Sequence, residues 1–182
     1  LNLLDLYIGT YKQYQKKWLE MVKIKDNYLS TEEYNLLKNN MESTYFPWYY
    51  NHNKTWQPTS DPKLFEYQFV HIFYNNDKVN SNKFDHLDPI IKKLKPLSLI
   101  RVKANLTPIS HKLIKSDKHY DQNFKCKIAI YYLNDNNGYT IIGDKKVESK
   151  SNRMVLFDSD KEHYGTNSTN CNNRIIINFN YF

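Results

Sequence analysis

The chain has 182 residues, with 26 Lys and Arg against 19 Asp and Glu, a formal net charge of +7, and a hydrophobic fraction of 40%. A chain of this length buries about 70% of its extended surface on folding, so a single domain over residues 1–182 needs no metal or disulfide staple. The lysines are scattered along the chain, which favours a solvated basic surface over a patch built for a polyanion.

The glycine and cysteine contents exclude several kinds of site. Only four glycines are present, and their spacing cannot form a G-x-G-x-x-G dinucleotide loop or a G-x-S-x-G nucleophile elbow. Gly138 and Gly143 have the spacing of a phosphate-binding loop, but Asp144 stands where that loop needs a lysine. Cys126 and Cys171 are too few for a cysteine-based zinc site or a dense disulfide framework, although one disulfide stays open.

Signals for export and for membrane insertion are absent from the sequence. No cationic run precedes an apolar stretch in Leu1–Thr10, and no segment approaches the roughly 18 consecutive apolar residues that span a bilayer. We therefore expect a soluble protein with no membrane partner, located in the cytoplasm, or in the host cytoplasm if the chain is viral.

Three helices are predicted before residue 97. Apolar residues at helical spacing predict the first over Tyr11–Val22, and a capping-box pattern that starts at Ser30 predicts the second. Asp88, interpreted as an N-cap before Pro89, predicts a third, shorter helix.

Strands are also expected in this first part of the chain. Aromatic and β-branched residues predict strands at 48–50 and 65–74. Residues 1–96 are thus expected to form a helical and strand support. The aromatic side chains there could line a substrate groove, but we expect them to fill the space between helices and sheet; they are Trp48, Tyr49, Tyr50, Phe65, Tyr67 and Phe69.

The second part of the chain, residues 97–182, is predicted to contain strands and no helix. Asn136-Asn137-Gly138 and Gly143-Asp144 supply turn residues between consecutive strands, which favours antiparallel hairpins. The fold class is therefore mainly β with N-terminal helices packed on one side of a sandwich or barrel. The predicted strands are Leu97–Leu106, Phe124–Leu133, Tyr139–Ile142, Lys145–Glu148, Arg153–Phe157 and Arg174–Phe182.

Two histidines stand two residues before an aspartate. On an extended segment such residues project to one side, so a His and an Asp at this spacing can bind one metal ion. In the pair of His86 and Asp88 the aspartate is better explained as a helix cap, whereas His119 and Asp121 lie between two predicted strands. We therefore choose the second pair.

A third ligand has to come from elsewhere in the chain. His163 is the only histidine downstream, and we expect it in a polar turn after the strand that ends at Phe157. His119, Asp121 and His163 would occupy one face of an octahedral metal and leave three positions open, which suits non-haem Fe(II). Arg174 follows eleven residues after His163 and can grip a carboxylate in the same pocket.

These residues resemble a known family. The order of H-x-D, distal His, Arg and closing strand is similar to that of the Fe(II)/2-oxoglutarate-dependent oxygenases, specifically their prolyl-4-hydroxylase-like branch and its compact phage-type members. Ile130–Asn134 resembles the strand motif of that branch, Gly138-Tyr139-Thr140 its turn, and Arg174–Phe182 its final strand. The resemblance covers about Leu97–Phe182 and implies a double-stranded β-helix, or jelly-roll, core with the metal site in it.

The resemblance also implies cofactors and roles. Fe(II) would be the cofactor, 2-oxoglutarate and O₂ the cosubstrates, and ascorbate is a further candidate. The catalytic metal ligands would be His119, Asp121 and His163. Residues expected to bind 2-oxoglutarate are Arg174 and Tyr132 at its distal carboxylate, with Asn105 and Asn178 adding polar contacts.

The substrate implied by this branch is a prolyl or other peptidyl side chain, and hence a protein or peptide partner. A nucleic-acid base is the enzymatic alternative, which is disfavoured because the repair branch has a second Arg where this chain has Asn180. The non-enzymatic alternative is a basic, aromatic-rich β-barrel that binds nucleic acid. That alternative leaves the order of the three metal ligands and Arg174 to coincidence.

Overall fold

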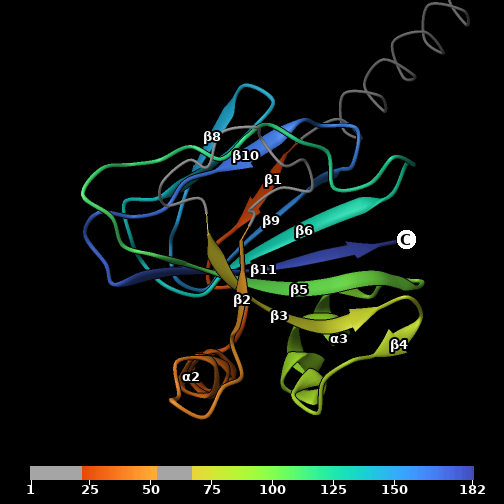
Figure 1. Cartoon of the computed structure of the whole chain (residues 1–182). Coiled ribbons are helices and arrows are strands. Elements are labelled where there is room, and N and C mark those ends of the chain that lie inside the picture. The colour runs from red at the N-terminus through yellow and green to blue at the C-terminus, as the bar shows by residue number, and fades with distance from the viewer. Residues whose placement is uncertain (1–21, 53–66) are drawn as a thin grey trace, which may run out of the picture.

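The computed structural model describes residues 22–52 and 67–182, and strands dominate it (Figure 1). Within these residues, the larger sheet has eight strands, all paired antiparallel, and β4 (Lys78–Val79) extends it beside β3. The other seven strands follow one another across the sheet in the order β1 (Lys23–Lys25), β9 (Arg153–Asp158), β6 (Lys127–Tyr132), β11 (Asn173–Tyr181), β5 (Leu99–Pro108), β3 (Gln68–Asn75) and β2 (Tyr49–Asn51).

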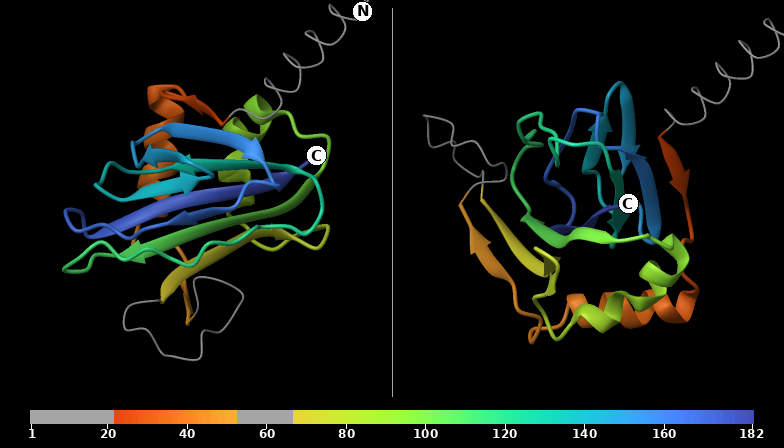
Figure 2. Two further views of the ribbon diagram at one scale, coloured as in Figure 1. Left: turned by 90° about the horizontal axis from the view of Figure 1, so that it is seen from above. Right: turned by 90° about the vertical axis from the view of Figure 1, so that its right-hand side faces the viewer.

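A second, smaller sheet faces the first. It contains β10 (His163–Gly165), β7 (Tyr139–Ile142) and β8 (Lys145–Glu148) in that spatial order. From β6 onward the chain crosses to this sheet for β7 and β8, returns for β9, crosses again for β10 and returns for β11 (Figure 2). This winding between two antiparallel sheets is a jelly roll, as the sequence predicted.

Helices cover the outer face of the larger sheet (Figure 2). They are α2 (Thr31–Met41), the 3₁₀ helix η1 (Phe84–Leu87) and α3 (Asp88–Leu94). Side chains alternate across a strand, so Ile175, Ile177 and Phe179 of β11 point into the core beneath these helices. The same alternation directs Arg174, Ile176 and Asn178 into the space between the two sheets.

The helix predictions are confirmed in part. Ser30 caps α2 with a full capping box, in which its Oγ accepts from Glu33 N at 3.2 Å and Glu33 accepts from Ser30 N at 3.0 Å. The helix predicted over Tyr11–Val22 lies outside the described residues except for Val22, which directly precedes β1 and is not helical. The cap assigned to Asp88 was wrong, because α3 already includes Asp88 and its N-cap is Leu87.

The strand predictions after residue 97 are confirmed, with ends that shift by up to three residues. Three short strands, β1, β4 and β10, were missed because two or three residues carry too little periodicity. Gly143, at φ +55°, closes the predicted β7–β8 hairpin. The hairpin predicted at Asn136–Gly138 was wrong, since β6 and β7 belong to different sheets.

The structure also shows the state of the two cysteines and the character of the helices. Cys126 and Cys171 are both free, which settles the disulfide that the sequence left open. Among the described residues, no helix combines the length and apolar character that crossing a bilayer requires.

Candidate metal centre

The three predicted metal ligands lie together at one end of the space between the sheets. His119 and Asp121 come from the segment between β5 and β6, and His163 begins β10. The backbones of His119 and His163 exchange two hydrogen bonds of 3.0 Å each, so an antiparallel bridge fixes the two histidines side by side. His163 is therefore in a strand, and its predicted place in a polar turn was wrong.

The geometry of the three side chains fits a metal ion. Candidate ligand atoms of His119, Asp121 and His163 all lie within 4.8 Å of one another. The Nε2 atoms of the two histidines lie 3.9 and 4.0 Å from Asp121 Oδ1. Each Nδ1 faces a backbone carbonyl, at 3.0 Å for His119 and 3.2 Å for His163, so Nδ1 donates and the Nε2 lone pair is directed inward.

Electrostatics favour the ligating form of this site. Burial by itself raises the pKa of Asp121, but the nearby His163, Arg101 and His119 outweigh it and lower the pKa overall. Burial lowers the pKa of His163, which keeps its imidazole neutral. Asp121 Oδ2 is buried without a hydrogen-bond partner in the described chain, while Arg101 Nη2 lies 3.2 Å from Oδ1. Two imidazoles and one carboxylate are the donor set of non-haem Fe(II) sites.

Arg174 is a buried cation near the start of β11. It is 3% exposed; its Nε donates to Ser149 Oγ at 2.7 Å and its Nη2 to Thr140 Oγ1 at 2.9 Å. Both partners are neutral hydroxyls, and Arg174 makes no ion pair with any described residue. Burial lowers its pKa, although a guanidinium stays charged. Arg174 is thus held in one orientation with no anionic partner among residues 22–52 and 67–182.

Gly138 makes room for this arginine. A Cβ at that position would stand 2.7 Å from Arg174 Cδ and 2.6 Å from the carbonyl oxygen of Asn167. The glycine that the sequence assigned to a hairpin turn is thus required by a close approach of distant chain segments.

The remaining predicted cosubstrate residues occupy two different environments. Tyr132 is fully buried and does not line the cavity. Its hydroxyl donates a hydrogen bond to Thr140 Oγ1 at 2.8 Å, and its ring centroid lies 5.5 Å from Arg174 Cζ. Asn105 and Asn178 do line the cavity, and the Oδ1 atom of each is buried without a hydrogen-bond partner in the described chain. The other predicted pair, His86 and Asp88, lies elsewhere, in η1 and α3.

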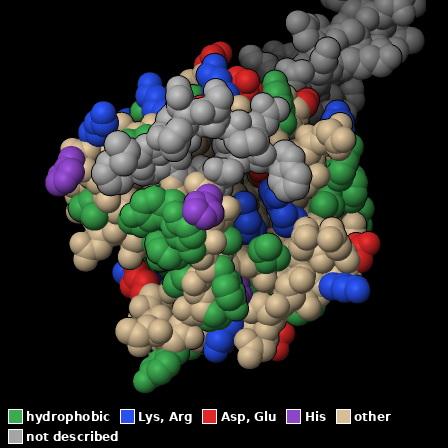
Figure 3. All heavy atoms as spheres, in the orientation of Figure 1, with side chains coloured by type: hydrophobic (Ala, Val, Ile, Leu, Met, Phe, Trp, Pro, Cys, Tyr) green, Lys and Arg blue, Asp and Glu red, His purple; other side chains and the backbone are tan. Residues whose placement is uncertain are grey.

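A cavity of about 1860 Å³ connects the three metal-ligand side chains with Arg174. Lys and Arg side chains gather at the hollow in the centre of the face seen in Figure 3. Sequence reasoning missed Arg101 and Lys103, which line the cavity from β5, and the two hydroxyls that hold Arg174. The sequence did contain a signal for Arg101 and Lys103, because positions 101, 103 and 105 of a predicted strand lie on the same face as each other.

Comparisons with known proteins support the fold. No family model and no curated protein matches the sequence. Among solved structures, a Trichoplax adhaerens prolyl hydroxylase in complex with a hypoxia-inducible factor peptide is similar over 100% of this chain and 94% of its own, with a TM-score of 0.62 and 13% identity. The non-haem α-ketoglutarate-dependent epimerase SnoN of nogalamycin biosynthesis has a TM-score of 0.63 at 10% identity, covering 90% of this chain and 78% of its own.

A third similar structure is an oxidoreductase of the 2OG-Fe(II) oxygenase family from Burkholderia pseudomallei, with a TM-score of 0.56 and 9% identity over 88% of this chain and 83% of its own. Structural neighbours of the chain are thus 2-oxoglutarate- and Fe(II)-dependent oxygenases, including a prolyl hydroxylase. At these identities the likeness establishes the jelly-roll fold alone.

Proposed function

We propose that the protein is an Fe(II)- and 2-oxoglutarate-dependent oxygenase. The observation that carries the proposal is the joint presence, in one cavity, of three converging ligand side chains and a buried guanidinium that is paired with no carboxylate of the described residues. A dianion with a chelating keto acid at one end and a carboxylate at the other matches both features. The fold of the structural neighbours agrees with this assignment.

Each residue of the site has a distinct role in this proposal. His119, Asp121 and His163 would hold the iron, and the carbonyls behind the two imidazoles fix the ring orientations. When bound, iron, 2-oxoglutarate and O₂ supply the oxidising power that hydroxylates a substrate, with succinate and CO₂ as the other products. The protein's own contribution is ligation, orientation and exclusion of water.

Arg174 would bind the distal carboxylate of 2-oxoglutarate. Ser149 and Thr140 hold the guanidinium in one orientation, and Tyr132 acts through Thr140 as a positioning residue rather than through direct contact. Asn105 and Asn178 line the same cavity, and the Oδ1 atom of each has no hydrogen-bond partner in the described chain. Ile130 and Ile176 add apolar walls that limit access of water to the chemistry.

For the substrate we propose a prolyl or other peptidyl side chain. The support is that one structural neighbour with a TM-score of 0.62 is a prolyl hydroxylase whose structure includes a peptide. The phage-type assignment and the role of ascorbate stay predictions.

Succinate formation tests the proposed activity. We expect the purified protein, with Fe(II) and O₂, to convert 2-oxoglutarate to succinate slowly without substrate and faster with a proline-containing peptide that is hydroxylated. The matched control omits iron. Intact, folded protein that produces no succinate above this control would contradict the proposal.

A further inference from the structure

Besides Arg174, the cavity is lined by a half-buried cation, Lys103, that the proposed chemistry does not use. Arg101, Lys103 and Asn105 occupy alternate positions of β5, so all three face the cavity. Arg101 has an anionic partner, because its Nη2 lies 3.2 Å from Asp121 Oδ1. Lys103 makes no hydrogen bond and no ion pair with any residue of the described chain.

The surroundings of Lys103 do not satisfy its ammonium group. The side chain is half-buried, and burial together with the charge of Arg101 lowers its pKa to about 8, although the charge of Asp121, which is not in hydrogen-bond contact with Lys103, acts in the opposite direction. Asn178 stands opposite Lys103 in the β5–β11 register, yet its Oδ1 accepts no hydrogen bond in the described chain. A desolvated, unpaired cation destabilises a fold, so its presence in a cavity indicates a ligand that completes it.

Among the described residues that line the cavity, the charges of the proposed complex leave Lys103 as the one half-buried cation without an ion-pair partner. In that complex Arg174 faces the distal carboxylate of 2-oxoglutarate, and Asp121 serves both the metal and Arg101. Lys118 is already paired with Glu162 at 3.4 Å, and the side chain of Lys125 is exposed to water. Two more amide groups, on Asn105 and Asn178, line the cavity on the same strands as Lys103 and Arg174.

We propose that Lys103 anchors an oxyanion of the substrate, either a carboxylate or a phosphate, next to the metal centre. This inference rests on the proposed function, and it narrows the substrate class to molecules that carry such a group near the carbon that is oxidised. A charge-assisted contact of this kind strengthens binding by about ten- to a hundredfold.

Inorganic phosphate and acetate are the probes that test the proposal. Protein labelled with ¹³C in its lysines, and loaded with Zn(II) and 2-oxoglutarate, is titrated with each anion while the ε-carbon signal of Lys103 is followed by NMR. We expect a saturable shift of that signal and a raised pKa of Lys103. The anion that saturates at the lower concentration identifies the substrate group as phosphate or carboxylate.

Variants separate this role from others. Lys103→Met should weaken anion binding by about ten- to a hundredfold, Lys103→Arg should restore most of it, and Lys125→Met, at the water-exposed rim of the same cavity, should leave it unchanged. Removing an unpaired buried charge should also raise the melting temperature of the metal-free protein. A lower melting temperature with unchanged anion binding would place Lys103 in the scaffold and overturn the proposal.

Two further results would overturn the proposal. A third result would separate the oxyanion site from the proposed oxygenase activity. If neither anion shifts the Lys103 signal up to 100-fold excess over protein, Lys103 binds no oxyanion. If Lys103→Met weakens 2-oxoglutarate itself, the lysine serves the cosubstrate. If wild-type protein fails to bind 2-oxoglutarate yet Lys103 still binds phosphate or acetate, the proposed oxygenase fails and the oxyanion site stands.

Discussion

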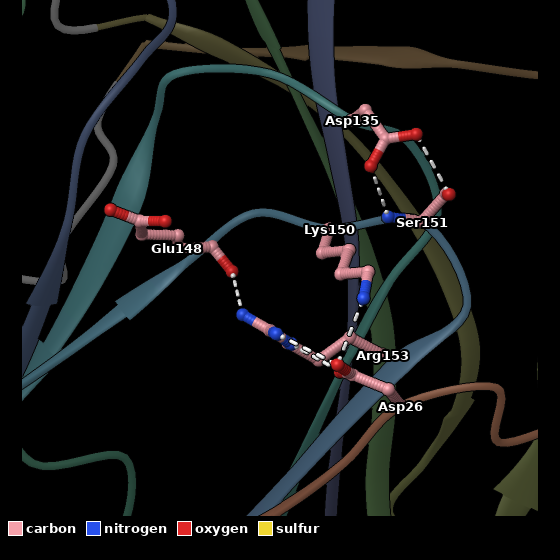
Figure 4. A network of polar contacts seen from close by, with 6 residues as sticks. All are labelled: Asp26, Asp135, Glu148, Lys150, Ser151 and Arg153. Carbon is pink, nitrogen blue, oxygen red and sulfur yellow. Dashed lines mark hydrogen bonds and ion pairs between the residues drawn. The ribbon is translucent and has the colours of Figure 1, made fainter.

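Two polar regions of the molecule differ in how far the chain satisfies its own charges. In the outer network of Figure 4, Arg153 donates to Asp26 through Nε at 2.6 Å and through Nη2 at 3.0 Å, and Lys150 donates to the same carboxylate at 3.0 Å. In the cavity, Arg174 and Lys103 have no carboxylate partner within the described residues. The first region joins the residue that follows β1 to the start of β9, and the second lacks an anionic partner among the described residues.

The difference distinguishes structural charges from ligand-binding ones. Six buried side-chain nitrogen and oxygen atoms have no hydrogen-bond partner in the described chain, and all of them belong to Asp121 or to strands β5 and β11. An unpaired buried polar atom is unfavourable by about 1–3 kcal/mol, so a fold retains such atoms where a ligand completes them. Four of the six atoms belong to residues that line the cavity, which are Arg101, Asn105, Asp121 and Asn178. The outer network contributes to stability, and we infer that the cavity is arranged for binding.

Removing a metal ligand should have the largest effect. His119→Ala and Asp121→Ala should each abolish iron-dependent succinate formation and retention of metal after dialysis, because three protein ligands are needed to hold the ion while leaving positions open. His86→Ala, which changes the other H-x-D pair, should keep both properties. An inactive His86 variant beside an active His119 variant would show that the wrong pair was chosen.

The next effect concerns cosubstrate affinity alone. Arg174→Lys keeps the charge but loses the planar fork, so we expect the 2-oxoglutarate concentration for half-maximal turnover to rise about ten- to a hundredfold. Metal affinity should be nearly unchanged, because no ligand is altered. A variant with a lower melting temperature and normal 2-oxoglutarate affinity would move Arg174 from the binding region to the structural one.

The third prediction concerns Gly138, which lies against the buried side chain of Arg174. Gly138→Ala would push a methyl group against Arg174 Cδ and the Asn167 carbonyl, so we expect destabilisation of about 1–3 kcal/mol in denaturant unfolding. Gly165→Ala is the matched control, because its Cβ would meet Arg174 Nη1 at an ordinary 3.5 Å. Equal stability of the two variants would show that the close approach at Gly138 is unimportant.

The smallest effect belongs to the outer network. Hydrogen bonds from Arg153 and Lys150 lower the pKa of Asp26 from 3.8 to about 2. Its stabilising contribution is therefore fully present above pH 3.8 and is lost as the pH falls toward 2. Because Asp26 is 35% exposed, screening reduces this contribution to about 1 kcal/mol.

Thermal unfolding across pH checks this contribution. Asp26→Asn should lower stability at neutral pH and remove this part of the acid dependence, while succinate formation stays normal. Asp77→Asn makes the same charge change in an exposed turn and should leave stability unaltered. An Asp26 variant with impaired turnover would contradict the separation of the two regions.

Local signals explain which parts of the fold could be predicted from the sequence. The bounds of β7 and β8 matched because clear alternation flanks Gly143 and Asp144, and the helix after Ser30 matched because its capping box acts within four residues. The short strands β1, β4 and β10 were missed, since tertiary pairing rather than local pattern creates them, whereas the three-residue β2 was predicted from its aromatic residues.

Residues of the site could be predicted where the sequence pattern is local. Residues whose role depends on neighbours that are distant in sequence were missed. The spacing of His119 and Asp121 pointed to one face of an extended segment, and the structure brings His163 to them. Lys103 escaped attention because an isolated lysine on a strand is ordinary until its burial is known. Gly138 was assigned to a turn because its true neighbour, Arg174, is distant in sequence.

Anaerobic addition of Fe(II) and 2-oxoglutarate tests most directly whether the incomplete cavity is a binding site for this chelate. The account predicts that a weak visible charge-transfer band appears with wild-type protein and is lost in His163→Ala. In Arg174→Lys the band should form only at about ten- to a hundredfold more 2-oxoglutarate. Folded wild-type protein that develops no band at saturating iron and 2-oxoglutarate would contradict the account.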